Sequence, residues 1–176
     1  MQQHKLAQLR ARPTRAASGG RLRCLILALS LASLQAGADT GVAGWTDQGK
    51  GVLMQNQSHM RWTQNDNGQD IGWEQARAYC RGMGMGWRLP TLAELTEMNA
   101  AARLVDEHAA CGDALCQASP LFHLSSNWYW SDTALTQAES EEFDELAWGL
   151  LLVNGRRTQA LRDASYGSRA LCVQAQ

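Results

Sequence analysis

The first 38 residues contain no aspartate or glutamate, although six lysine and arginine residues lie among them. They also lack an apolar run of the roughly 20 residues that a membrane-spanning helix needs, because the run from Leu25 ends at Ala32. A basic start, a short apolar centre and the small residues at 36–38 are typical of a cleaved secretory signal. A membrane anchor is the alternative, which the short run disfavours. The sequence therefore predicts a signal peptide over residues 1–38 and export to the periplasm, the cell surface or the medium.

Residues 39–176 lack an excess of basic charge. All 17 acidic residues lie there, together with 10 of the 16 basic residues, so this part carries a net charge of −7. Proteins that bind nucleic acid need a basic surface that neutralises phosphates. The charge therefore argues against nucleic acid and against an anionic membrane surface as partners. The length is that of a single domain with its own core.

Phenylalanine is also scarce, since Phe122 and Phe143 are the two in the chain. Other large side chains must then fill the interior, and the sequence contains seven tryptophans: Trp45, Trp62, Trp73, Trp87, Trp128, Trp130 and Trp148. Exposed tryptophans bind sugar rings, but most of these fall at positions that the local pattern predicts to be buried. Trp128 and Trp130 share one face of a predicted strand, so Tyr129 faces the other way and is the better surface residue.

Four cysteines follow residue 38: Cys80, Cys111, Cys116 and Cys172. An even number in an exported chain indicates two disulfides, with three pairings to choose from. The sequence favours a small loop closed by Cys111 and Cys116, which leaves Cys80 for Cys172. A metal site is the alternative, but the cysteine spacing is loose for zinc and no histidine stands at ligand spacing.

The hydrophobic pattern predicts two helices near the front and strands behind them. Residues 39–51 are rich in small and polar side chains and indicate a leader, so that the folded domain spans residues 52–176. The predicted elements are helices at 73–83 and 92–104 and strands at 52–54, 60–63, 86–89, 127–131, 147–153, 156–161 and 170–173. Asn154-Gly155 is a strong signal for a two-residue hairpin turn. This order indicates an α+β fold.

The first helix has signals at both ends. Asp70 is its expected start signal, and glycines at 82, 84 and 86 end it. Its predicted buried stripe holds Trp73, Ala76, Cys80 and Met83.

The second helix follows directly on a short strand that contains Trp87 and Arg88. Thr91 and Glu94 have the spacing of a capping box at its start, and its apolar side holds Leu92, Leu95 and Met98. Arg88 is flanked by apolar residues, and an unpaired buried charge is costly. We therefore expect Arg88 to form an ion pair or backbone contacts, and we assign Trp87, Arg88, Thr91 and Glu94 to structure.

These motifs together resemble a bacterial domain of unknown function called DUF1566, or the Lcl C-terminal domain. The matching segments, which cover about residues 52–174, are Met60–Trp62, Trp73–Cys80, Gly86–Thr91 with Glu94-Leu95, Ser119–Phe122, Trp128–Thr133, Ala147-Trp148 and Arg169–Val173. The family is similar in fold to C-type lectins and, distantly, to the formylglycine-generating, sulfatase-modifying domain. The resemblance implies an α+β, C-type-lectin-like fold with two helices around a small twisted antiparallel sheet. It also implies a disulfide from the first helix to the last strand, which would be Cys80–Cys172.

The sequence departs from the calcium-binding lectins of this fold, because it contains neither of their tripeptides, EPN and QPD. A faint calcium-loop pattern over Thr63–Glu74 starts with threonine instead of aspartate. The acidic run 139–145 is a further cation candidate, although solvated acidic loops are far commoner. No metal or cofactor is therefore predicted, and calcium is a candidate that the sequence does not support.

The residues and the resemblance predict an exported, non-enzymatic binding or adhesion module whose ligand is a protein or a polysaccharide. The cysteines that the enzyme relatives need are assigned to disulfides here, and no histidine has a matched serine or cysteine partner. Candidate ligand-binding residues lie in the loop region and the last hairpin: Tyr129, Asp132, Arg156 and Arg157. A structural subunit of an exported assembly is the alternative, and an oxidase-type enzyme is less favoured.

Overall fold

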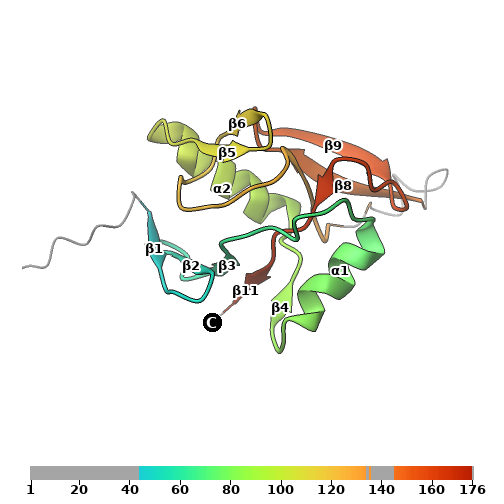
Figure 1. Ribbon diagram of the computed structural model, residues 1–176, viewed down its shortest axis with the longest axis horizontal. Coiled ribbons are helices and arrows are strands. Elements are labelled where there is room, and N and C mark those ends of the chain that lie inside the picture. Colours follow the sequence, from blue (N-terminus) through green and yellow to red (C-terminus); the bar gives the residue numbers. More distant parts are fainter. Residues whose placement is uncertain (1–43, 134, 136–144, 176) are drawn as a thin grey trace, which may run out of the picture. The chain divides into compact units, whose positions relative to one another are not determined.

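The computed structural model describes residues 44–133, 135 and 145–175 (Figure 1). The predicted signal peptide and residues 139–144 of the acidic run lie outside the described residues. The described residues form two helices, α1 (Trp73–Gly82) and α2 (Leu92–Leu104), which confirms the α+β prediction. Their strands are β1 (Trp45–Asp47), β2 (Val52–Gln55), β3 (Arg61–Thr63), β4 (Trp87–Arg88), β5 (Ala109–Cys111), β6 (Ala114–Cys116), β7 (Trp128–Trp130), β8 (Leu146–Leu151), β9 (Arg156–Leu161), β10 (Ser168–Arg169) and β11 (Val173–Gln174).

These strands form two sheets and a separate hairpin, which differs from the single small antiparallel sheet predicted. The first sheet has the order β1-β2-β3-β11-β4 and is antiparallel throughout. The second has the order β10-β7-β8-β9, in which β10 pairs with β7 in parallel and the other pairs are antiparallel. The hairpin consists of β5 and β6.

The C-terminal segment produces this arrangement because it joins both sheets. β10 pairs with β7, and further along the chain Val173 of β11 lies between Trp62 of β3 and Arg88 of β4. The predicted closing strand at 170–173 is therefore split. Its first three residues connect the two sheets, and pairing with the first sheet starts at Val173.

The central strands of the second sheet, β7 and β8, are buried on both faces. Side chains alternate along β7, so that Tyr129 packs in the same hydrophobic cluster as Leu95 of α2, and Trp130 packs in the same cluster as Ala76 of α1. Both Tyr129 and Trp130 are fully buried. The prediction that Tyr129 lies at the surface is wrong, because the face that we expected to be exposed is covered by α2.

The folded part begins earlier than predicted. β1 pairs with β2 along its whole length. Trp45 of β1 is 2% exposed, and its ring makes an edge-to-face contact with Phe122 at a centroid distance of 4.8 Å. Residues 45–51 therefore belong to the domain and are not a leader, which corrects the predicted boundary at residue 52.

Tertiary contacts set the start of α1. Gly72 is the N-cap residue and offers no side-chain cap, while the Trp73 N–H donates to the Arg162 carbonyl at 2.8 Å. A Cβ at Gly72 would lie 3.1 Å from the same carbonyl oxygen and 2.5 Å from Gln75 Oε1, so a larger residue would have to displace the Gln75 side chain and crowd the carbonyl. The expectation that Asp70 starts the helix is wrong, since its carboxylate forms an ion pair with Arg169.

The capping box predicted for α2 is confirmed. Thr91 Oγ1 accepts from the Glu94 N–H at 3.2 Å, and the Glu94 carboxylate accepts from the Thr91 N–H at 2.7 Å. Arg88 makes the expected ion pair, because its Nη1 and Nη2 donate to the two Glu94 oxygens at 2.8 and 2.7 Å. Burial alone would raise the pKa of Glu94, but the hydrogen bonds from Arg88 and Thr91 lower the pKa below its ordinary value. Trp87, on the same strand, is half-buried against the α1 cluster.

Both predicted disulfides are confirmed. Cys80–Cys172 joins α1 to the connection between β10 and β11 across 92 residues, and both cysteines are fully buried. Cys111–Cys116 closes the β5–β6 hairpin. Cys80 also ends the buried stripe of α1, because Met83, which was expected to continue it, is 42% exposed.

Loss of the long disulfide should destabilise the protein more than loss of the short one. Chain entropy assigns about 4–5 kcal/mol to a loop of the longer size and about 2 kcal/mol to the hairpin loop. Replacing Cys80 and Cys172 by alanine should therefore lower the free energy of unfolding about twice as much as replacing Cys111 and Cys116. Urea denaturation of the two double variants measures the difference, and equal losses would contradict it.

Arg88→Ala should lower the free energy of unfolding by about 1 kcal/mol, because a partly exposed ion pair that steadies the capping box is lost. Since the folded-state pKa of Glu94 is lowered, its stabilising contribution is present above the ordinary pKa and is lost as pH falls through the folded value. Thermal melts of the wild type and of Arg88→Ala at neutral and at acidic pH measure both the contribution of the ion pair and its loss at low pH. Arg81→Ala, at an exposed position in the last turn of α1, is the matched control. An unchanged melting temperature for Arg88→Ala would disprove the structural role.

Candidate functional site

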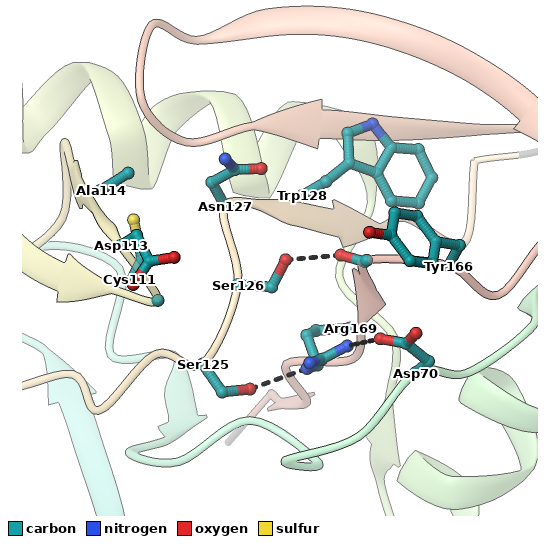
Figure 2. Close-up of a pocket in the computed structure, with 12 residues that line it drawn as sticks. Asp70, Cys111, Asp113, Ala114, Ser125, Ser126, Asn127, Trp128, Tyr166 and Arg169 are labelled. Atoms are coloured by element: carbon teal, nitrogen blue, oxygen red, sulfur yellow. Dashed lines mark hydrogen bonds and ion pairs between the residues drawn. The ribbon is translucent and has the colours of Figure 1, made fainter.

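A pocket of about 630 Å³ opens beside the β5–β6 hairpin, the segment before β7 and the turn before β10 (Figure 2). The residues that line it are Asp70, Cys111, Gly112, Asp113, Ala114, Ser125, Ser126, Asn127, Trp128, Tyr166, Gly167 and Arg169. They come from parts of the chain that are far apart in sequence, so the pocket exists only in the folded domain. Hydroxyl, amide, carboxylate, guanidinium and aromatic groups are all present, and these groups bind ligands through hydrogen bonds, charge and ring contacts.

Arg169 of β10 holds two walls of the pocket together (Figure 2). Its Nη1 donates to the Asp70 carboxylate, and its Nε donates to Ser125 Oγ at 2.7 Å. The Arg169 side chain is only 13% exposed. Its hydrogen bond to Asp70 lowers the pKa of that carboxyl below its ordinary value. Asp70 is therefore ionised and paired at neutral pH.

A buried carboxylate lies behind Ser125. Asp66 is 8% exposed, and its Oδ2 accepts from the Ser125 N–H at 2.6 Å and from the Tyr129 hydroxyl at 2.7 Å. Its Oδ1 accepts from the Gly68 N–H at 2.8 Å and from Ser125 Oγ at 2.9 Å. Burial raises the pKa of Tyr129, as does the nearby Asp66 charge, so the hydroxyl stays a neutral donor. Asp66, Ser125 and Arg169 thus form a continuous hydrogen-bonded path from the core to the pocket.

Two aromatic side chains, Trp128 and Tyr166, lie at one end of the pocket (Figure 2). The Trp128 Nε1 donates to Thr158 Oγ1 at 2.6 Å. The Trp128 ring lies on Gly149 of β8, where a Cβ would be 2.3 Å from the ring. Trp128 is therefore fixed and half-buried, whereas Tyr166 is 96% exposed.

Two smaller depressions adjoin the pocket through shared residues. One, of about 580 Å³, shares Ser125 and includes Asp66 and His123 in its lining. The other, of about 350 Å³, shares Asp70 and includes Asp163. Together with the pocket they form an extended surface that a ligand larger than one small molecule can contact.

None of the four residues predicted to bind a ligand lines this pocket. Tyr129 is buried, and Asp132 accepts from Arg77 Nε at 2.7 Å. Arg156 and Arg157 are exposed on the edge strand β9, but adjacent strand residues point to opposite faces of a sheet. The structure therefore does not bring the four predicted residues together.

Sequence reasoning missed Asp70, Ser125, Tyr166 and Arg169 as site residues. Because Asp70 matches a helix start signal, we assigned it to the start of α1 and not to a contact with Arg169. Arg169 is the first residue of the motif Arg169–Val173, which is part of the resemblance to DUF1566. This motif is the sequence feature that could have pointed to Arg169 as a site residue. The contact between Asp70 and Arg169 spans 99 positions, and no local pattern predicts a contact of that range.

Within residues 44–133, 135 and 145–175, no group of three or more histidine, cysteine, aspartate and glutamate side chains is placed to hold a metal ion. The same ranges contain no helix with the length and apolar character needed to cross a membrane.

No family model matches this chain, and no curated protein matches it. Among solved structures, botrocetin is similar over 77% of this chain and 99% of its own, with 14% sequence identity and a TM-score of 0.39. The complex of botrocetin with the A1 domain of a von Willebrand factor mutant shows 9% identity and a TM-score of 0.39 over the same shares. EMS16, an antagonist of the collagen receptor integrin α2β1, is 12% identical over 77% of this chain and 100% of its own, with a TM-score of 0.37.

Asp66→Asn should lower the free energy of unfolding by about 2–3 kcal/mol, because it removes a charge that accepts hydrogen bonds and turns a donor toward one of its partners. Tyr129→Phe removes one of these bonds and should cost about 1–2 kcal/mol. Because the two groups interact, the double variant should lose less than the sum. Urea denaturation measures all three, with Tyr79→Phe, 40% exposed on α1, as a control that should change little. Fully additive losses would show that the two groups are not coupled.

Proposed function

We propose that this protein is an exported, non-enzymatic binding module with a C-type-lectin-like fold, related to the DUF1566 family, whose ligand is a protein or a polysaccharide. The pocket of about 630 Å³ is the observation that carries the proposal. Ligand pockets commonly have volumes of about 300–1,000 Å³ and combine aromatic side chains with a few placed polar groups. Here Trp128 and Tyr166 supply the rings, and Asp70, Asn127 and Arg169 supply polar groups.

The fixed contacts of the pocket support binding over catalysis. Ser125 Oγ accepts from Arg169 Nε at 2.7 Å and donates to the Asp66 carboxylate at 2.9 Å, so this hydroxyl bridges two charged groups. Cys111, at the wall of the pocket, is bonded to Cys116 and is therefore not a thiol nucleophile. Groups that are held in place before the ligand arrives lose little conformational entropy on binding.

The disulfides support export. Disulfides persist in oxidising compartments and are rare in the cytosol. Cys80–Cys172 and Cys111–Cys116 are both formed within the core of the domain. Together with the signal peptide predicted over residues 1–38, they favour a place in the periplasm, at the cell surface or in the medium.

Filling the pocket should abolish ligand binding. Ala114 lines the pocket, whereas its neighbour Leu115 is 65% exposed and does not. Ala114→Trp should therefore remove the binding that the wild-type protein shows on arrays of polysaccharides and peptides, while Leu115→Trp should retain it. The two variants are compared as oxidised proteins of equal melting temperature, so that a folding defect is not mistaken for lost binding.

Either of two results would count against the proposal. Wild-type binding by Ala114→Trp would place the site elsewhere on the protein. A wild-type protein that binds nothing on either array would contradict the binding function itself.

A further inference from the structure

Building on the proposed function, we propose that the pocket takes a basic side chain, a lysine or an arginine, which projects from a protein partner. Asp70 and Asp113 line the pocket, and Asp163 lines the depression that shares Asp70. Arg169 is the one basic residue among the described residues that line either of them. The pocket and this depression together hold three carboxylates and one guanidinium.

That guanidinium is already engaged and does not provide an anion site. Its Nη1 donates to Asp70 and, at 3.1 Å, to the Ser168 carbonyl, while its Nε donates to Ser125 Oγ at 2.7 Å. The side chain is 13% exposed, so little of it faces solvent. Because Asp70 neutralises Arg169, the surface around the pocket keeps the negative charges of Asp113 and Asp163.

Asp113 is the carboxylate best placed to receive a cation. It lies in the turn between β5 and β6 and is exposed, and its carboxylate forms no hydrogen bond or ion pair with the residues that the structure describes. An ammonium or guanidinium group can therefore pair with it without breaking an existing contact. A cleft lined by charges of one sign also raises the local concentration of oppositely charged partners.

The aromatic end of the pocket, which lies across the pocket from Asp113 (Figure 2), also suits a cationic group. Cations bind over the faces of tryptophan and tyrosine rings, with about 0.5–1 kcal/mol at exposed sites. Trp128 is held by its bond to Thr158, and Tyr166 projects into solvent beside the pocket. A neutral sugar would also stack on these rings, but it would leave Asp113 without a counter-charge. An acidic polymer would meet the carboxylates, so the charge favours a basic side chain of a protein.

The test uses the oxidised protein and blocked tetralysine as the probe, with tetraglutamate and the neutral sugar maltotetraose for comparison. Calorimetric titration at low ionic strength should detect binding of tetralysine but not of tetraglutamate or maltotetraose. Physiological salt should weaken the binding of tetralysine. Asp113→Asn should weaken tetralysine binding about twofold to fivefold, the effect of one exposed ion pair. Tyr166→Ala should have an effect of about the same size, whereas Tyr166→Phe keeps the ring and should bind as the wild type does.

Asp106→Asn is the matched control. The Asp106 side chain is 97% exposed and does not line the pocket. Its φ of 56° is a conformation that asparagine also adopts, so the variant removes a charge without straining the backbone. It should leave the affinity for tetralysine unchanged.

The outcomes separate this inference from the proposed function. Equal weakening by Asp113→Asn and Asp106→Asn would show general attraction to an acidic protein and would overturn the inference. Binding of maltotetraose or tetraglutamate that Ala114→Trp removes would also overturn it, while the binding function would stand. If no probe and no array ligand binds, both fail.

Discussion

The closing segment of the chain, residues 168–174, is the constraint on which both the fold and the pocket depend. Its first residues pair in parallel with β7, and its last residues pair with β3 and β4. Between these pairings the Cys80–Cys172 disulfide ties the segment to α1, and the Thr63 backbone and hydroxyl exchange two hydrogen bonds with Cys172. Because Arg169 lies on this segment, the anchoring that joins the two sheets also places the guanidinium in the pocket.

A buried charge connects the core to that pocket. Taking the Asp66 carboxylate out of water costs desolvation free energy, and hydrogen bonds from Gly68, Ser125 and Tyr129 offset the cost. These donors come from the loop before α1, the segment before β7 and β7 itself, so they fix how those parts lie against one another. Ser125 also accepts from Arg169, and the positions of the pocket side chains are therefore set by a network that begins in the core.

Local patterns predict contacts between residues that are close in sequence and fail for contacts that the fold creates. The capping box of Thr91 and Glu94 follows from spacing alone, because both partners lie in one helical turn. For Tyr129, alternation along the strand gives the right face, but the pattern cannot show that a helix covers each face of that sheet. The pocket is harder to predict still, since Asp70 meets Arg169 across 99 positions.

Several arginines of the domain, including the one in the pocket, are engaged in contacts within the fold. Arg88 is paired with Glu94 beside α2, and Arg77 and Arg162 lie over the Trp73 ring at 4.6 and 4.7 Å. Arg169 is held by Asp70. Each of these guanidinium groups contacts a carboxylate or the Trp73 ring, so its charge is already stabilised by another group of the domain. Asp113, by contrast, has no such internal partner among the described residues, so the unpaired charge at the pocket is negative.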